Sequence, residues 1–172
     1  VFAFHFACKL TTVIACSFGL FIAFNSYNIL FLWTGDAVVA SRGLIALQLF
    51  VFSIVVNSFV LMPYQMQLAY GWTRLTIRLN LTLLIIFFPL TYFLASHFGL
   101  IGSAASSLLL NILLLFSTTY LMFNKILSAE RTAWFFGDLF TPSIVILLSM
   151  SSYTLLLKSF VFTSSLLCLS SS

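Results

Sequence analysis

Two apolar runs decide the fold: residues Leu79–Ala95 read LNLTLLIIFFPLTYFLA, and residues Ser103–Phe123 read SAASSLLLNILLLFSTTYLMF. Neither run contains a charged residue. A helix needs about 20 predominantly apolar residues to cross the roughly 30 Å hydrocarbon core of a bilayer. Neither run alternates apolar and polar side chains, as the strands of a membrane β-barrel do. Each run therefore predicts a transmembrane helix.

The rest of the chain has the same character. Of its 172 residues, 62% are hydrophobic and 6% are charged, whereas a typical soluble domain has about 25% charged residues. The composition excludes the soluble classes and predicts an all-α, polytopic membrane bundle with the lipid bilayer as its solvent. The net charge of +4 comes from scattered single Lys and Arg residues. This scatter indicates topology signals and not a nucleic-acid partner.

Charged residues, glycines and prolines divide the chain into about six predicted spans. These are Leu10–Leu32, Gly43–Met62 (closed by Pro63), Leu79–Ser96, Ser103–Phe123, Leu139–Leu157, and a truncated span from Ser159. The chain begins at Val1 and ends in serines within an apolar stretch. We therefore expect a fragment of a longer protein, with residues 1–172 forming one six-helix unit.

The loops differ in their content of Lys and Arg. If Lys9 is cytoplasmic, the loops after the second and fourth spans share its side, and the other side receives Arg42 and Lys158. The cytoplasmic set is then Lys9, Arg74, Arg78, Lys125 and Arg131. The positive-inside rule favours this orientation. It places Asp36 and His97 on the opposite side.

Several polar residues lie within the predicted spans. Asn25, Asn57 and Asn111 either bond to neighbouring helices, as such groups commonly do, or line a water-filled cavity that contacts substrate. Pro89 lies inside the third span and predicts a kink, which serves either packing or a transport cycle.

The segment from Tyr64 to Arg78 is amphipathic. Tyr70 and Trp72 suit the headgroup level, and Arg74 and Arg78 are four residues apart on one helical face. Two interpretations stay open for the arginines. They anchor the helix at the interface, or they bind the phosphate or pyrophosphate of a lipid.

Few residues are candidates for chemistry. The acids and histidines are Asp36, Glu130, Asp138, His5 and His97. We interpret Glu130 and Asp138 as solvated loop charges and His97 as a turn residue. The cysteines Cys8, Cys16 and Cys168 form no CxxC motif and are interpreted as small packing residues. The sequence therefore predicts no catalytic residue, no metal ligand and no cofactor, and we expect no enzyme.

A series of motifs resembles a known family. The motifs are LFLWTGD (Leu30–Asp36), MPYQMQLAYGWT (Met62–Thr73), HFGLIGSAA (His97–Ala105), Asn111, Glu130, Trp134, and Asp138 before Thr141-Pro142. Their order and spacing over Leu10–Ser143 resemble the carboxyl-terminal half of bacterial polysaccharide flippases. These are the O-antigen and teichoic-acid exporters of the multidrug/oligosaccharidyl-lipid/polysaccharide superfamily.

The resemblance implies a function and a location. Such proteins have two six-helix lobes that rock around a central cavity and move a lipid-linked oligosaccharide between leaflets. The chain would then be the second lobe, its partner would be a missing amino-terminal lobe, and its location would be the bacterial inner (plasma) membrane. A multidrug-type exporter of small molecules is one alternative, for which we expect a buried acid that couples transport to an ion. A membrane enzyme of glycan assembly is another, for which we expect a large periplasmic loop.

Overall fold

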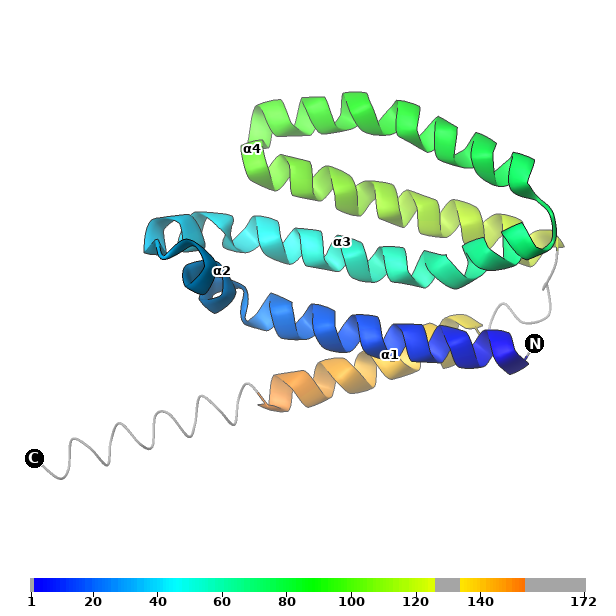
Figure 1. Cartoon of the computed structure of the whole chain (residues 1–172), viewed down its shortest axis with the longest axis horizontal. Coiled ribbons are helices and arrows are strands. Elements are labelled where there is room, and N and C mark those ends of the chain that lie inside the picture. Colours follow the sequence, from blue (N-terminus) through cyan, green and yellow to red (C-terminus); the bar gives the residue numbers. More distant parts are fainter. Residues whose placement is uncertain (1, 126–133, 154–172) are drawn as a thin grey trace, which may run out of the picture.

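The computed structural model describes residues 2–125 and 134–153, and all its regular structure within these ranges is helical (Figure 1). The elements are α1 (Phe2–Phe24), α2 (Ser26–Thr34), α3 (Ala37–Ala69), α4 (Thr73–Lys125) and the π-helix η2 (Trp134–Phe140). An α-helix over residues 141–153 continues from η2. The all-α prediction is confirmed for the part of the chain that is described.

The first predicted span is divided between two helices. Asn25 separates α1 from α2, and its backbone φ and ψ of −102° and 15° are not helical. Its side chain donates to the carbonyl of Phe21 at 2.9 Å. Helix α2 ends at Gly35, which has a left-handed φ of 68°. The carboxylate of Asp36 then caps α3 by accepting from the backbone N–H groups of Val38 and Val39.

Helix α3 does not end at Pro63, so that predicted boundary is wrong. Pro63 is buried inside α3, which continues to Ala69. A proline removes only one hydrogen bond from the helical ladder, and packing against neighbouring helices compensates for this loss in membrane helices. The α3 helix ends instead at Tyr70 and Gly71, where Gly71 has a φ of 75°.

Helix α4 has two limbs that meet at Gly99. This residue has a φ of 58° and a ψ of −131°, which reverses the chain within one residue. The first limb contains Pro89 and corresponds to the third predicted span; the second limb corresponds to the fourth. The limbs pack closely because Gly102 has no side chain to collide with the carbonyl of Leu94.

The predicted number of about six spans is not confirmed. Within the described ranges, three helices are long and apolar enough to cross a membrane: Phe2–Phe24, Ala37–Ala69 and Thr76–Tyr120. The last contains both limbs of α4. The predicted spans at Leu139–Leu157 and from Ser159 fall partly or wholly outside the described residues.

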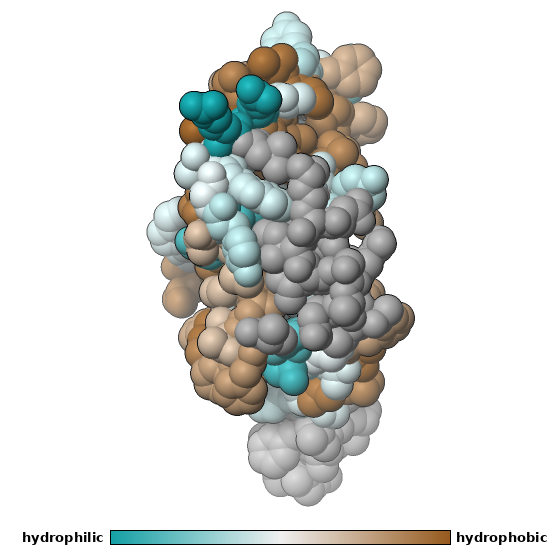
Figure 2. All heavy atoms as spheres, turned by 90° about the vertical axis from the view of Figure 1, so that its right-hand side faces the viewer, coloured by the Kyte–Doolittle hydropathy of each residue, from teal (hydrophilic) through white to brown (hydrophobic). Residues whose placement is uncertain are grey.

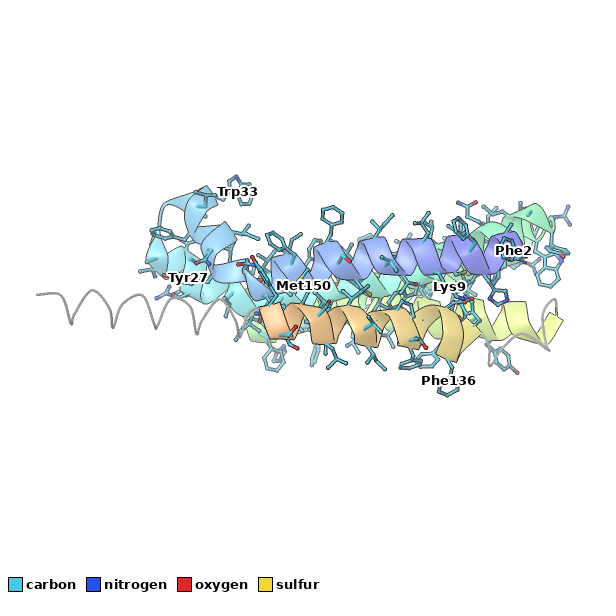
Figure 3. All side chains as sticks on the ribbon, turned by 90° about the horizontal axis from the view of Figure 1, so that it is seen from below. Phe2, Lys9, Tyr27, Trp33, Phe136 and Met150 are labelled. Carbon is cyan, nitrogen blue, oxygen red and sulfur yellow. The ribbon has the colours of Figure 1, made fainter. Side chains whose placement is uncertain are left out.

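Consecutive long helices run in opposite directions in a layered bundle, so α3 and the second limb of α4, which lie side by side, run parallel (Figure 1). Helix α3 lies between α1 and the second limb of α4, and the first limb of α4 forms the outer layer. The helix over 141–153 lies along α1 (Figures 1 and 3). The start of α1 and the α3–α4 turn lie at one end of the bundle, while α2 and Gly99 lie at the other. Large apolar side chains are exposed along most of its length.

Candidate functional site

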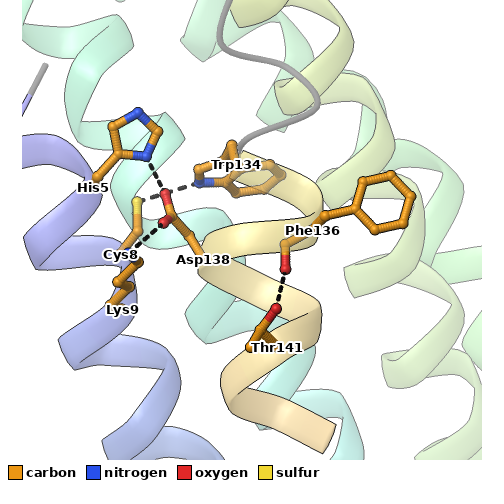
Figure 4. A network of polar contacts seen from close by, with 7 residues as sticks. All are labelled: His5, Cys8, Lys9, Trp134, Phe136, Asp138 and Thr141. Carbon is orange, nitrogen blue, oxygen red and sulfur yellow. Dashed lines mark hydrogen bonds and ion pairs between the residues drawn. The ribbon is translucent and has the colours of Figure 1, made fainter.

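A polar cluster joins α1 to η2 (Figure 4). The buried carboxylate of Asp138 pairs with Nδ1 of His5 through one oxygen, and its other oxygen lies 3.7 Å from Nζ of Lys9. Asp138 is 2% exposed, whereas the Lys9 side chain is 57% exposed. One α1 face therefore supplies an imidazole and a cation to an acid that lies 133 residues after His5 in the chain.

A second contact in this cluster is less polar. The Trp134 side chain is fully buried, and its indole Nε1 donates to Sγ of Cys8 at 3.2 Å. About two turns further along α1, Sγ of Cys16 lies 3.4 Å from the hydroxyl oxygen of Ser143. Phe4, Cys8, Trp134 and Leu139 form the buried apolar core of this region. Apolar packing, the hydrogen bond between His5 and Asp138, and the ion pair with Lys9 together hold η2 against α1.

The local sequence explains why η2 is a π-helix. Pro142 has no N–H for the helical ladder. The hydroxyl of Thr141 donates to the carbonyl of Phe136, five residues earlier, at 2.6 Å. Single-turn π-helices are rare and occur frequently at functional sites. The widened turn presents both Trp134 and Asp138 to α1 (Figure 4).

The interpretation of Asp138 as a solvated loop charge is wrong. Asp138 is buried, and the cost of removing its charge from water is offset by His5 and Lys9. No local motif signals this pairing, because its partners lie in the first helix. Asp36 is an exposed helix cap, and His97 lies exposed two residues before the Gly99 bend. Glu130 lies outside the described residues.

The three predicted asparagine sites have different environments. Asn111 is 8% exposed, and its Nδ2 donates to the hydroxyl of Ser53 on α3 at 2.7 Å. Asn25 bonds within its own chain segment, and Asn57 is exposed on the surface of α3. Of the two interpretations, bonding between helices is thus observed for Asn111. The structure does not bring the three asparagines together.

Arg74 and Arg78 lie exposed in the first turns of α4. Among the described acids, none forms an ion pair with either arginine. In Figure 2, which faces this end of the molecule, hydrophilic side chains gather near the top, where α4 begins, and apolar side chains surround them. The arginines therefore lie where an anion from outside the bundle can approach.

A buried hydrogen-bond network fixes the start of α4, the segment that carries Arg74 and Arg78. Gln67 on α3 donates from Nε2 to the carbonyl of Thr118 at 3.0 Å, and its Oε1 accepts from the hydroxyl of Thr76 at 3.2 Å. Gln67 thus connects α3 to both limbs of α4 and fixes the start of the first limb. The sequence offered only a weak signal for this role, namely a glutamine in an amphipathic segment.

Two hollows lie along the bundle. One of about 420 Å³ lies between α3, the second limb of α4 and η2, and apolar residues such as Phe59, Leu115 and Phe140 line it. The other, of about 580 Å³, lies at the α2 end. None of the five predicted site residues lines either hollow. Among the residues that are described, no group of three or more His, Cys, Asp and Glu side chains is placed to hold a metal ion.

Comparison of the chain with protein-family models, with curated proteins and with solved structures finds no match. The fold therefore has to be classified from its own features. Over its described length this is an all-helical protein with three helices suited to cross a membrane.

Proposed function

We propose that this chain forms one lobe of a membrane transporter that moves a lipid-linked oligosaccharide from the cytoplasmic leaflet by alternating access. The order of the sequence motifs supports this proposal, as do the alternating directions of consecutive long helices and the polar contacts between α3 and α4. The partner lobe would complete the cavity, and the exposed Asn57 on α3 would face it.

The observation that carries the proposal is the exposed pair Arg74 and Arg78 at one end of the bundle. A lipid-linked oligosaccharide has a phosphate or pyrophosphate between its lipid and its sugar. Two guanidinium groups one helical turn apart can bind such an anion through paired, charge-assisted hydrogen bonds. Tyr70 and Trp72, immediately before α4, suit the headgroup level where this anion lies.

Substitution of the arginines tests the proposal. The purified chain, reconstituted in phosphatidylcholine vesicles, is mixed with a polyprenyl-pyrophosphate oligosaccharide, and its binding is measured. Arg74→Lys with Arg78→Lys keeps both charges but loses the planar geometry of the guanidinium groups. We expect binding to fall about tenfold or more, since charge-assisted bonds are each worth about 1.5–3 kcal/mol.

A charge-neutral variant separates recognition from anchoring. Arg74→Gln with Arg78→Gln should lose binding as well. If the lysine variant binds like the parent chain and only the glutamine variant is impaired, the arginines act only as interfacial charges. That result would contradict the proposal.

The burial of Asp138 favours a second candidate function, which is ion-coupled export of a small molecule. An exporter of this kind needs an acid inside the bundle that can take up and release an ion. Asp138, paired with His5 and Lys9, is the only described acid that is buried. Under this alternative, Asp138→Asn abolishes export of a cationic dye while Arg74→Lys with Arg78→Lys has no effect. For glycolipid transport we expect the reverse: Arg74→Lys with Arg78→Lys impairs transport, and Asp138→Asn has no effect on it.

A further inference from the structure

The hollow at the α2 end is an open groove. Residues from α2, α3 and both limbs of α4 line it, and its volume is about 580 Å³. Its floor is formed by the small buried residues Ala46 and Ala104, while the large side chains of Trp33, Phe50 and Leu100 are exposed at its rim. A long, narrow molecule can therefore lie between the rim residues and reach the floor.

The groove contains hydroxyl groups, but they have partners within the protein. Thr34, Ser103 and Ser107 each donate to a backbone carbonyl three or four residues earlier, at 2.7, 2.8 and 3.3 Å. The hydroxyl of Thr91 lies 3.0 Å from that of Ser106. Because these hydroxyl groups already form hydrogen bonds within the protein, the walls present mainly methyl and methylene groups to a ligand. Such a surface suits a hydrocarbon chain better than a sugar or water.

A cation lies on the same stripe of α3 as the groove. Val39, Gly43 and Ala46 line the groove, and Arg42 falls three residues after the first and four before the last, the spacing of one helical face. Arg42 is exposed, and no acid in the described ranges pairs with it. Its positive charge can therefore attract an anion near the mouth of the groove.

The position of Trp33 indicates the level of the groove in the membrane. Trp33 is 86% exposed and points outward at the α2 end of the molecule (Figure 3). Tryptophan is enriched where the hydrocarbon core meets the headgroups. The mouth of the groove, with Arg42 beside it, thus lies at headgroup level, and its floor lies deeper.

We propose that this groove binds one tail of an anionic phospholipid whose phosphate interacts with Arg42. The apolar walls match the tail, and the exposed cation of Arg42 matches the charge of the headgroup. The inference requires the helices to cross a membrane, but it does not depend on the transport function proposed above.

Retention of lipid during purification tests the proposal. The 172-residue chain is reconstituted in vesicles of equal parts phosphatidylcholine and phosphatidylglycerol, extracted in mild detergent and analysed by native mass spectrometry. We expect the parent chain to retain phosphatidylglycerol in preference to phosphatidylcholine. Ser107→Phe, which fills the groove, should lose most of the retained lipid. Arg42→Gln should lower the ratio of the two lipids about fivefold, the effect of one cation near an anionic surface.

Leu109→Phe provides the matched control. It adds a ring to the same limb of α4, at an exposed position that does not line the groove, and should retain lipid like the parent chain. Equal retention by Ser107→Phe and Leu109→Phe would overturn the proposal, and so would an unchanged lipid ratio in Arg42→Gln. A lipid-free dimer would also overturn it, because a second copy would then cover the groove.

Discussion

At the scale of single residues, the buried carboxylate of Asp138 should contribute to stability. Removing its charge weakens the contact with His5 and takes the carboxylate away from Lys9. We expect Asp138→Asn to lower the free energy of unfolding by about 1.5–3 kcal/mol, the usual contribution of a hydrogen bond to a charged group. Thermal unfolding in detergent measures the change. His5→Ala combined with Asp138→Asn should cost less than the sum of the single changes, because the two side chains interact.

Asp36→Asn is the control for this experiment. Asp36 is exposed and caps α3 through the backbone N–H groups of Val38 and Val39. Asparagine caps helices about as well as aspartate. The variant should therefore unfold like the parent chain, and an equal loss in both variants would contradict a specific role for Asp138.

The asparagines allow a second residue-scale prediction. Asn111 bonds to Ser53 in the interior, whereas Asn57 is exposed on the same helix as Ser53. Asn111→Leu should destabilise the chain by about 0.6 kcal/mol, the average for polar contacts between membrane helices. Asn57→Leu should leave stability unchanged or raise it. Chemical denaturation in mixed micelles measures the free energy of unfolding of both variants. An equal change in both would show that burial does not determine how much an asparagine stabilises the protein.

The same residues show what sequence reasoning can predict of the site. Local spacing is enough to place Arg74 and Arg78 on one helical face in the connection before the third predicted span, whereas the structure has them in the first turns of α4. It could not pair Asp138 with His5, because 133 residues separate them and neither belongs to a motif. It also missed Gln67, whose partners Thr76 and Thr118 become neighbours only when α4 folds back.

At the scale of helices, an apolar run predicts that a helix is present better than it predicts where the helix begins and ends. The two limbs of α4 were predicted because Gly99 interrupts otherwise continuous apolar sequence. The end of α3 was placed too early at Pro63, since packing compensates for one missing hydrogen bond. The break at Asn25 is not predicted, because a few small polar residues such as Asn25, Ser26 and Asn28 in an apolar run are usually compatible with a continuous helix.

Gly102 controls the packing of the two α4 limbs. A Cβ atom at this position would collide with the backbone carbonyl of Leu94. We expect Gly102→Ala to lower the melting temperature, because backbone atoms cannot move aside as a flexible side chain can. The cost should be in the range of overpacking, about 1–3 kcal/mol.

Gly137→Ala is the matched comparison for Gly102. A Cβ atom at Gly137 meets nothing within 4 Å, and alanine is a better helix former than glycine by about 1 kcal/mol. The variant should be as stable as the parent chain or more stable. If Gly102→Ala and Gly137→Ala lose stability equally, close packing of the two α4 limbs does not explain the loss in Gly102→Ala.

At the scale of the whole molecule, the first limb of α4 runs opposite to α3 and places the turn after α3 and the Gly99 bend at opposite ends (Figure 1). We expect cysteines at Tyr70 and His97 to react with a membrane-impermeant maleimide from opposite sides of the membrane. Gly71 and Gly99 themselves are unsuitable, because their positive φ disfavours a side chain. The native cysteines are replaced by alanine for this test. Labelling of both positions from the same side would contradict the arrangement.

The bend at Gly99 also determines how this protein can enter a bilayer during its synthesis. One residue joins the two limbs of α4, so almost no polar chain is available to remain outside while the first limb waits for the second. We therefore expect the two limbs to insert together as a helical hairpin. Thr91 and Ser106 meet across this hairpin, and each hydroxyl reaches hydrocarbon with its partner already present.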